Sequence, residues 1–232
     1  MSKLSIVGTP IGNLGDLTIR ALDALKSADI VLCEDTRVTK KLLSHYGLEK
    51  PTLSYHSHSK LSRSEEIIGL IREGKDLALV SDAGTPGISD PGAELVSRVR
   101  EALSAEIDSG AVKIEAIPGP SALVAALSIA GVPCADFTFL GFLPHKKGRE
   151  TLFKEIASSE RTMVFYESPH RILRSLLSLA DHLGPGSKKA VTVCRELTKI
   201  YEEVKSGPAE SVLEFFEAHP DKVRGEFVVI VS

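Results

Sequence analysis

The sequence is poor in cysteine, has no long apolar run and carries no large excess of charge. Its three cysteines, Cys33, Cys134 and Cys194, are far apart and odd in number, and no signal peptide precedes them. We therefore expect reduced thiols in a cytoplasmic protein rather than a disulfide framework. The longest apolar stretch, residues 122–132, is too short to cross a bilayer, so we expect a soluble protein. The net charge of −3 argues against nucleic-acid binding by overall charge but leaves a local basic patch open.

The first half of the chain alternates short apolar runs with segments of helical periodicity. The 232 residues suffice for one large domain or two small ones, and the 43% hydrophobic share supports a real core. Such alternation is typical of a parallel sheet with helices on both faces. Strands are expected at residues 4–7, 30–33, 52–55, 77–80 and 113–117. Helices are expected after the caps Asp16 and Asp90, over residues 37–46, and after the capping box formed by Ser62 and Glu65.

The turn at residues 118–120, Pro-Gly-Pro, separates the two halves. We expect an N-terminal α/β domain over residues 1–118 and a C-terminal α/β domain over residues 119–232. The second half has candidate strands at residues 138–142, 162–166, 190–194, 201–205 and 227–231, and a helix from Ser168 to Gly184. The run from residue 190 to residue 205 has no long helical insert, which predicts antiparallel pairing and hence a mixed second sheet.

The loop Asp82–Gly92 follows the apolar strand at residues 77–80 and is rich in glycine, proline and aspartate. Glycine lets a backbone approach a ligand closely, and proline holds a loop in one shape. Open α/β sheets bind ligands at the carboxyl ends of their parallel strands. The loop is therefore predicted to form one wall of a small-molecule pocket, the alternative being a rigid connector.

Three further segments carry polar side chains at expected strand or helix ends. Gly8–Asp16 follows the first strand but lacks the glycine spacing of a dinucleotide-binding turn, so it favours another small polar ligand. Glu34–Arg37 ends the second strand, where its charges either contact a ligand or are solvated. His170 and Arg171 are placed in the first turn of a helix, where cations oppose the helix dipole unless they meet an anion.

A basic loop and a pair of histidines complete the candidates. Residues 145–149, His-Lys-Lys-Gly-Arg, are either solvated or hold a nucleic-acid backbone. His56 and His58 have no Cys, Asp or Glu within a few residues to complete a zinc-like set. We therefore expect a polar loop there and no metal site.

Taken together, these motifs resemble the tetrapyrrole methylase superfamily and, within it, the ribosomal RNA small-subunit methyltransferase I group. Each stretch alone is a weak signal, but together they span nearly the whole chain in order. The matching stretches are Val7–Asp16, Glu34–Arg37, Ser81–Gly92, Pro118–Ala122, Gly141–Pro144, Phe165–Arg171 and Cys194–Lys199.

The resemblance implies a two-domain α/β fold with S-adenosylmethionine in the cleft between the domains. It implies 2′-O-methylation of a cytidine ribose in the decoding region of small-subunit rRNA, by a homodimer acting on rRNA or on the small ribosomal subunit. Members of the group often carry a further C-terminal segment after the strand that ends this sequence. The cofactor residues implied by the motifs are Ile11, Asp82, Ala83, Gly84, Gly87, Ser121, Ala122, Glu167 and Glu196.

The chemistry of methyl transfer adds a second set of expected residues. A ribose hydroxyl becomes a good nucleophile when its proton leaves, so a carboxylate base is expected. Glu167 and Glu196 are favoured, with Asp35 as a further candidate. The cations expected to neutralise rRNA phosphates are Arg37, His170, Arg171, Arg195 and Lys199.

Two rival functions stay open on the sequence. One is a methyltransferase of the same superfamily with a tetrapyrrole, another small molecule or a protein as substrate. The Asp82 loop departs from the Gly-Gly-Asp-Pro pattern of the porphyrin-modifying branch, which favours RNA. The other rival is a binding protein without catalysis, sensing the cofactor or assisting ribosome assembly. Retention of both glycine-rich loops argues against it.

Overall fold

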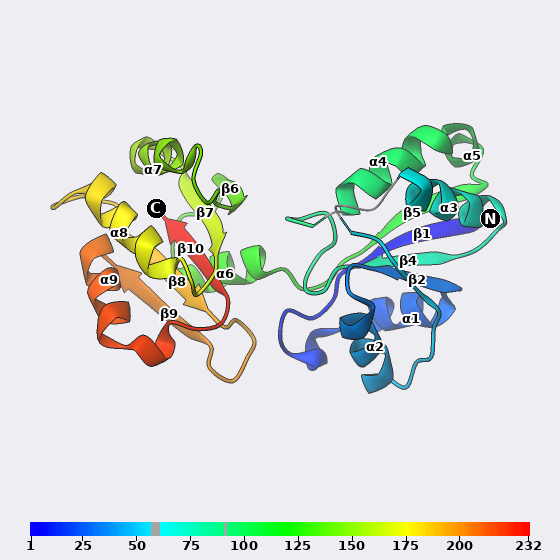
Figure 1. Ribbon diagram of the computed structural model, residues 1–232, viewed down its shortest axis with the longest axis horizontal. Coiled ribbons are helices and arrows are strands. Elements are labelled where there is room, and N and C mark those ends of the chain that lie inside the picture. Colours follow the sequence, from blue (N-terminus) through cyan, green and yellow to red (C-terminus); the bar gives the residue numbers. More distant parts are fainter. Residues whose placement is uncertain (57–60, 91) are drawn as a thin grey trace. The chain divides into compact units, whose positions relative to one another are not determined.

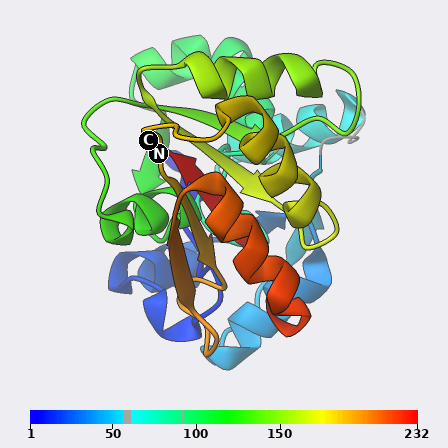
Figure 2. The same cartoon turned by 90° about the vertical axis from the view of Figure 1, so that its left-hand side faces the viewer.

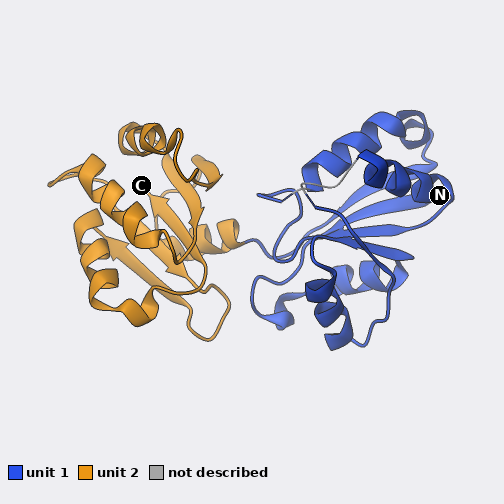
Figure 3. Ribbon diagram, in the orientation of Figure 1, with its two compact units in different colours: residues 1–121 blue, residues 122–232 orange. Residues whose placement is uncertain are grey.

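Each half of the chain builds its own five-stranded sheet. The structure is a computed structural model that describes residues 1–56, 61–90 and 92–232. It divides into unit 1, Met1–Ser121, and unit 2, Ala122–Ser232 (Figure 3). The division lies beyond the expected position after Pro118 because the Pro-Gly-Pro turn packs on unit 1. There, the Thr85 hydroxyl donates a hydrogen bond to the Pro120 carbonyl at 3.1 Å.

The sheet of unit 1 is parallel, as predicted. Its strands lie in the order β3-β2-β4-β1-β5. Their bounds are β1 Ser2–Val7, β2 Ile30–Cys33, β3 Thr52–Ser54, β4 Leu77–Val80 and β5 Val112–Ile117.

Helices cover both faces of this sheet, which confirms the second part of the prediction. Side chains alternate between the faces along a strand. Leu77 and Leu79 of β4 join a cluster with α3 and α4, whereas Ala78 and Val80 join one with α1 and α2 (Figure 1). The helices are α1 Ile19–Ser27, α2 Thr36–His45, α3 Leu61–Arg72, α4 Gly92–Ala102 and α5 Ser104–Asp108.

Several helices of unit 1 begin elsewhere than predicted. The α1 cap is Thr18, whose hydroxyl accepts the Ala21 N–H at 3.1 Å, while Asp16 lies in a short 3-10 turn, Leu14–Asp16. Helix α3 already includes Leu61, so Ser62 lies within the helix and is not its N-cap. The expected start of α4 at Pro91 lies outside the described residues, and α4 is described from Gly92.

The sheet of unit 2 is mixed, as predicted. Strand β6 pairs with β7 in parallel, whereas β7, β10, β8 and β9 pair antiparallel in that order. The strands are β6 Phe137–Phe142, β7 Thr162–Glu167, β8 Val191–Arg195, β9 Glu203–Gly207 and β10 Phe227–Val231.

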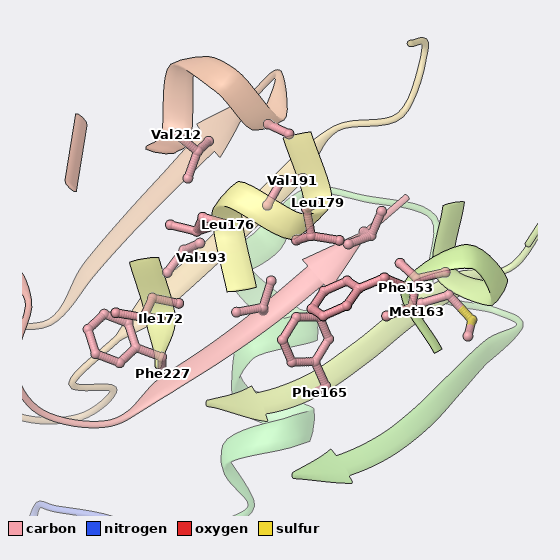
Figure 4. Packing of buried hydrophobic residues seen from close by; sticks show 14 of the residues in the cluster. Phe153, Met163, Phe165, Ile172, Leu176, Leu179, Val191, Val193, Val212 and Phe227 are labelled. Carbon is pink, nitrogen blue, oxygen red and sulfur yellow. The ribbon is translucent and has the colours of Figure 1, made fainter. Parts of the chain in front are cut away.

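The helices of unit 2 cover both faces of its sheet. Helices α7 (Arg149–Ser158), α8 (Ile172–Leu183) and α9 (Ala209–Ala218) lie across one face (Figure 2). They enclose a core in which Phe153, Phe165 and Phe227 are fully or almost fully buried (Figure 4). Helix α6 (Ala122–Ala130) packs on the opposite face, against β8 and β10. Within the described ranges, none of the helices combines the length and apolar character needed to cross a membrane.

Candidate functional site

Loops from four strands of unit 1 meet at one edge of its sheet. They follow β1, β2, β4 and β5, and parallel strands bring their carboxyl ends to the same edge. The sequence placed three candidate segments there: Gly8–Asp16, Glu34–Arg37 and Asp82–Gly92. The structure brings all three to this edge, together with the Pro118–Pro120 turn.

Backbone contacts hold the loops after β1, β4 and β5 together. Thr9 and Gly84 exchange two backbone hydrogen bonds, at 2.8 and 3.1 Å. Gly8 lies so close to Gly119 that a Cβ on Gly8 would stand 2.8 Å from the Gly119 Cα. Only a residue without a side chain permits that approach. The three loops therefore form one fixed surface.

Side chains lock the Asp82 loop to its neighbours. The buried Thr9 hydroxyl donates to the Ser81 carbonyl at 3.2 Å. Gly84 and Gly87 have φ of +85° and +87°, a backbone conformation that favours glycine. A Cβ on Gly84 would stand 3.4 Å from Cγ2 of Ile11, so these two expected cofactor residues are neighbours. The adjoining Ala83 is exposed, whereas Ile11 and Gly84 are buried.

Asp82 joins this surface to the loop after β2. It is exposed, and its Oδ1 accepts the backbone N–H of Asp35 at 3.1 Å. Asp35 caps α2 and forms an ion pair of 2.6 Å with Arg37. Hydrogen bonds from the Arg37 side chain and then from its backbone N–H lower the pKa of Asp35 to about 2. Asp35 therefore carries a fixed negative charge at neutral pH, and Arg37 is paired within the loop.

An open depression of about 490 Å³ lies beside Asp82. That volume is within the range of small-ligand sites. The lining mixes three carboxylates with hydroxyls, a guanidinium and an imidazole. Its residues are Glu34, Asp35, Thr36, Arg37, Ser54, His56 and Asp82.

Asp90 is a further carboxylate at this edge, and sequence reasoning gave it only a capping role. Burial, and then the negative charges of Glu34 and Asp82, raise its pKa to about 6. Asp90 and Glu34 also line a void of about 10 Å³, which is close to the space of one water molecule. In the sequence, the available signal for a functional Asp90 was that it and Asp82 bracket one glycine-rich loop.

We expect Asp90→Asn to change the pH dependence of unit 1's stability. The folded pKa is raised, so the folded state binds more protons than the unfolded state between about pH 4 and pH 6. The Asp90 contribution to stability is therefore lost as pH rises through this window. Urea unfolding at pH 4.5 and pH 7 should show the variant more stable relative to the wild type at pH 7. An identical difference at both pH values would contradict this electrostatic account.

In unit 2, Glu167 lies at the centre of a buried ion network. Its side chain is 0% exposed, and its Oε1 pairs with Arg171 at 2.8 Å while its Oε2 pairs with Arg149 at 3.6 Å. The Ser168 N–H donates to Oε1 at 2.8 Å and the Ser175 hydroxyl to Oε2 at 2.6 Å. Both oxygens are occupied, which suits a structural ion pair better than proton transfer or contact with a ligand.

Arg149 was not singled out as a site residue by the sequence, although it was seen within the basic loop. Its guanidinium is buried, donates to the Ser175 hydroxyl at 2.6 Å and to the Pro144 carbonyl at 3.3 Å. The placement of Arg171 in the first turn of a helix is wrong, because α8 begins at Ile172 with Arg171 as its cap. The anion that Arg171 meets is Glu167, whereas His170 is exposed.

Glu196 lies in the turn after β8, with a left-handed φ of +52°. Its carboxylate accepts the Lys199 ammonium at 2.8 Å and the Glu226 N–H at 3.0 Å. Burial disfavours ionisation, but these hydrogen bonds outweigh it and lower the pKa of Glu196. Lys199 also pairs with Glu226 at 2.7 Å, and the buried Arg195 faces Glu203 at 3.5 Å. The charges of Arg195 and Lys199 are thus matched within unit 2.

The expected site residues divide between the units. Ile11, Asp35, Arg37, the four residues of the Asp82 loop and Ser121 belong to unit 1. Ala122 opens α6 in unit 2, which also holds Glu167, His170, Arg171, Arg195, Glu196 and Lys199. Over the described residues, no three His, Cys, Asp or Glu side chains gather as a metal site, and His58 lies outside that range.

Comparison with known families gives one match over most of the chain. Residues 3–213 match the model of the tetrapyrrole (corrin/porphyrin) methylases. The match covers both units.

Three curated relatives are 42–44% identical to this chain over the aligned residues. A protein of Thermotoga maritima is 42% identical over all of this chain and 99% of its own. One of Synechocystis sp. is 42% identical over all of this chain and 79% of its own. One of Vibrio cholerae is 44% identical over 98% of this chain and 76% of its own. All three are named ribosomal RNA small subunit methyltransferase I.

Solved structures share the fold at low sequence identity. Diphthine synthase aligns with a TM-score of 0.69 and 17% identity, over all of this chain and 90% of its own. The methyltransferase CobJ aligns with a TM-score of 0.67 and 20% identity, over all of this chain and 94% of its own. These likenesses confirm the predicted two-sheet α/β fold.

Proposed function

Because the chain belongs to the tetrapyrrole methylase family, we propose that it methylates the 2′-hydroxyl of a cytidine ribose in small-subunit rRNA. The family is the one that the sequence motifs predicted, and its members named above are methyltransferases. The observation that carries the substrate proposal is identity of 42–45% across almost the whole chain to proteins named for small-subunit rRNA. We propose the decoding region as the target and S-adenosylmethionine as the methyl donor.

The loop surface of unit 1 suits that donor in chemistry. S-adenosylmethionine carries a sulfonium and an ammonium group, and the edge presents the carboxylates of Glu34 and Asp82. The exposed Ala83 and the half-buried Gly87, with its left-handed φ, leave part of the Asp82 loop accessible to a ligand. We assign cofactor binding to Ile11, Asp82, Ala83, Gly84, Gly87 and Ser121.

The chain's own residues supply binding and orientation for the reaction. When bound, S-adenosylmethionine supplies an activated methyl group, so the protein contributes alignment and electric field. Alignment of a nucleophile with its target can supply much of a rate enhancement. In unit 1, the hydrogen bonds among Thr9, Ser81 and Gly84 hold the Asp82 loop in one conformation. The Asp35 N–H holds the Asp82 carboxylate in place.

The three carboxylates expected to accept the ribose proton differ in how free they are. Glu167 is enclosed by two guanidiniums, and Glu196 is held by Lys199. Asp35 lines the open depression but has a pKa near 2. Since a base works best when its pKa lies near the working pH, we propose that Asp35 orients the ribose hydroxyl by accepting its hydrogen bond, and that solvent water takes the proton as the oxygen is methylated.

We expect Asp82→Ala to weaken binding of S-adenosylmethionine by about 10- to 100-fold, the value of a charge-assisted hydrogen bond. Isothermal titration calorimetry measures the change. Asp23→Ala, which removes an exposed carboxylate on α1, is the matched control and should bind as the wild type does. Equal affinities of the Asp82 variant and the wild type would remove Asp82 from the cofactor site.

The reaction is tested by incubating the protein with labelled S-adenosylmethionine and small ribosomal subunits, then mapping the rRNA by mass spectrometry. A methyl group on a cytidine ribose supports the proposal. A methyl group on a base or on a protein places the chain elsewhere in its family. Cofactor binding without turnover on subunits or free rRNA indicates a binding protein.

We further propose a homodimer that works in the cytoplasm. Helix α6 exposes Val124 (60%) and Ile129 (46%), and the β8–β9 turn exposes Ile200 (90%) and Tyr201 (69%). Large exposed apolar side chains gather where proteins associate. Sedimentation equilibrium distinguishes the dimer from a single chain.

A further inference from the structure

The basic loop at residues 145–149, with Leu143 and Pro144 directly before it, is fixed against the start of α8 by the buried ion network. Arg171 donates to the Leu143 carbonyl at 2.8 Å, and Arg149 donates to the Pro144 carbonyl at 3.3 Å. The same two guanidiniums flank Glu167 on β7. Residues 143–149 are thus held beside residues 167–174, although the two segments are distant in sequence.

These two segments concentrate positive charge in a chain whose net charge is −3. They contain five lysines and arginines and one carboxylate, Glu167. Burial is the main cause that lowers the pKa of Arg149, and the positive charges of Arg171 and Arg174 add to it. The single carboxylate of Glu167 therefore does not neutralise the positive charge of the two segments.

The outer cations of the two segments are exposed. Lys146, Lys147 and Arg174 are exposed, and none of them forms an ion pair within the part of the chain that the structure describes. The same holds for the ring of His170. Arg195 and Lys199 differ, because carboxylates of unit 2 already face them.

An exposed aromatic residue lies three positions before the basic loop in the sequence. Phe142 is 57% exposed at the end of β6, directly before Leu143, and its ring meets Tyr166 edge to face at 5.5 Å. Cations that track a phosphate backbone beside an aromatic ring on which a base can stack are the usual means of holding single-stranded nucleic acid. An inorganic phosphate has no base that could stack on the ring.

We propose that Lys146, Lys147, His170 and Arg174, with Phe142 as a stacking platform, form an RNA-binding surface on unit 2. The phosphodiester backbone of an unpaired rRNA segment occupies it. The inference rests on the proposed rRNA substrate and moves the phosphate contacts away from Arg195 and Lys199. Arg149, Glu167 and Arg171 act as positioning residues, because they hold the loop rather than touch the RNA.

The test is a gel shift with a decoding-region rRNA transcript over a range of salt concentrations. Each phosphate contact contributes about 0.7 to the slope of log affinity against log salt for a single strand. The double variant Lys146→Gln/Lys147→Gln should lower the magnitude of the slope by about 1.4. Its loss of affinity relative to the wild type should therefore be about 25-fold larger at 0.1 M salt than at 1 M salt. Phe142→Ala should weaken binding by about tenfold with little change in slope.

Lys188→Gln is the matched control, since Lys188 is exposed and lies beyond the other end of α8. It should bind RNA as the wild type does, and calorimetry should show unchanged cofactor affinity in every variant. A double variant with the wild-type slope overturns the RNA surface while leaving rRNA methylation by the wild type intact. A wild type that methylates no rRNA overturns the proposed function instead.

Discussion

Glu167→Gln should destabilise unit 2 by about 3–5 kcal/mol, the usual cost of removing one partner from a buried ion pair. The substitution preserves shape but leaves Arg149 and Arg171, whose side chains are 7% and 15% exposed, without a counter-charge. Both guanidiniums also hold the basic loop, so the loop should become less ordered when the guanidiniums lose their counter-charge. Hydrogen exchange at the amides of β7, β8 and β10 reports this loss separately from unit 1.

Two controls separate charge from packing. Glu226→Gln removes an ion-paired glutamate of the same unit that is 74% exposed, and should cost at most about 1 kcal/mol. The triple variant Arg149→Met/Glu167→Leu/Arg171→Met replaces the network by apolar side chains and should be more stable than Glu167→Leu alone. If the triple variant were the less stable of the two, the guanidiniums would stabilise unit 2 even without Glu167, and the charge-balance account would be wrong.

The parallel sheet was predictable because each of its strands has a recognisable local sequence pattern. Leu77–Val80 is buried on both faces, so it appears in the sequence as an unbroken apolar run that ends at a polar loop. The same local signal located the Asp82 loop at a strand end. Which loops touch was not predictable in this way, because the contact of Gly8 with Gly119 joins residues more than a hundred positions apart.

The helices of unit 2 show where local patterns fail. Helix α6 is apolar on nearly every side, so it has no helical period and was noted only as an apolar stretch. Helix α7 buries Arg149 beside Phe153, which breaks the apolar pattern. Helix α9 was not predicted, although the sequence carries a signal for it: Val212 and Phe216 recur at helical spacing.

Charged residues were the hardest to assign from sequence. Glu167 and Arg171 were expected to face a ligand, yet each finds its partner inside unit 2. A carboxylate in a sequence motif looks the same whether a guanidinium or a ligand meets it. The decisive partner, Arg149, lies 18 positions before Glu167 on another element, and only the fold brings them together.

Gly8→Ala should reduce methyl transfer, measured as kcat/KM, by about 10²-fold, because it displaces the loops proposed to hold the cofactor. The added Cβ would stand 2.8 Å from the Gly119 Cα and 2.9 Å from its nitrogen, so the obstacle is backbone that cannot rotate away. The loops after β1 and β5 must separate, at a cost of about 1–3 kcal/mol in stability. Gly119→Ala creates the reciprocal clash with the Gly8 carbonyl and should behave alike.

Gly69→Ala is the informative control, because it adds the same methyl group with the opposite expected effect on stability. Gly69 lies within α3, and a Cβ there meets nothing within 4 Å. Alanine in place of a helical glycine stabilises by about 0.5–1 kcal/mol, and kcat/KM should not change. Cofactor titration and urea unfolding of the three variants then separate the clash from the methyl group. Wild-type cofactor affinity in Gly8→Ala would show that the contact of Gly8 with Gly119 does not shape the binding surface.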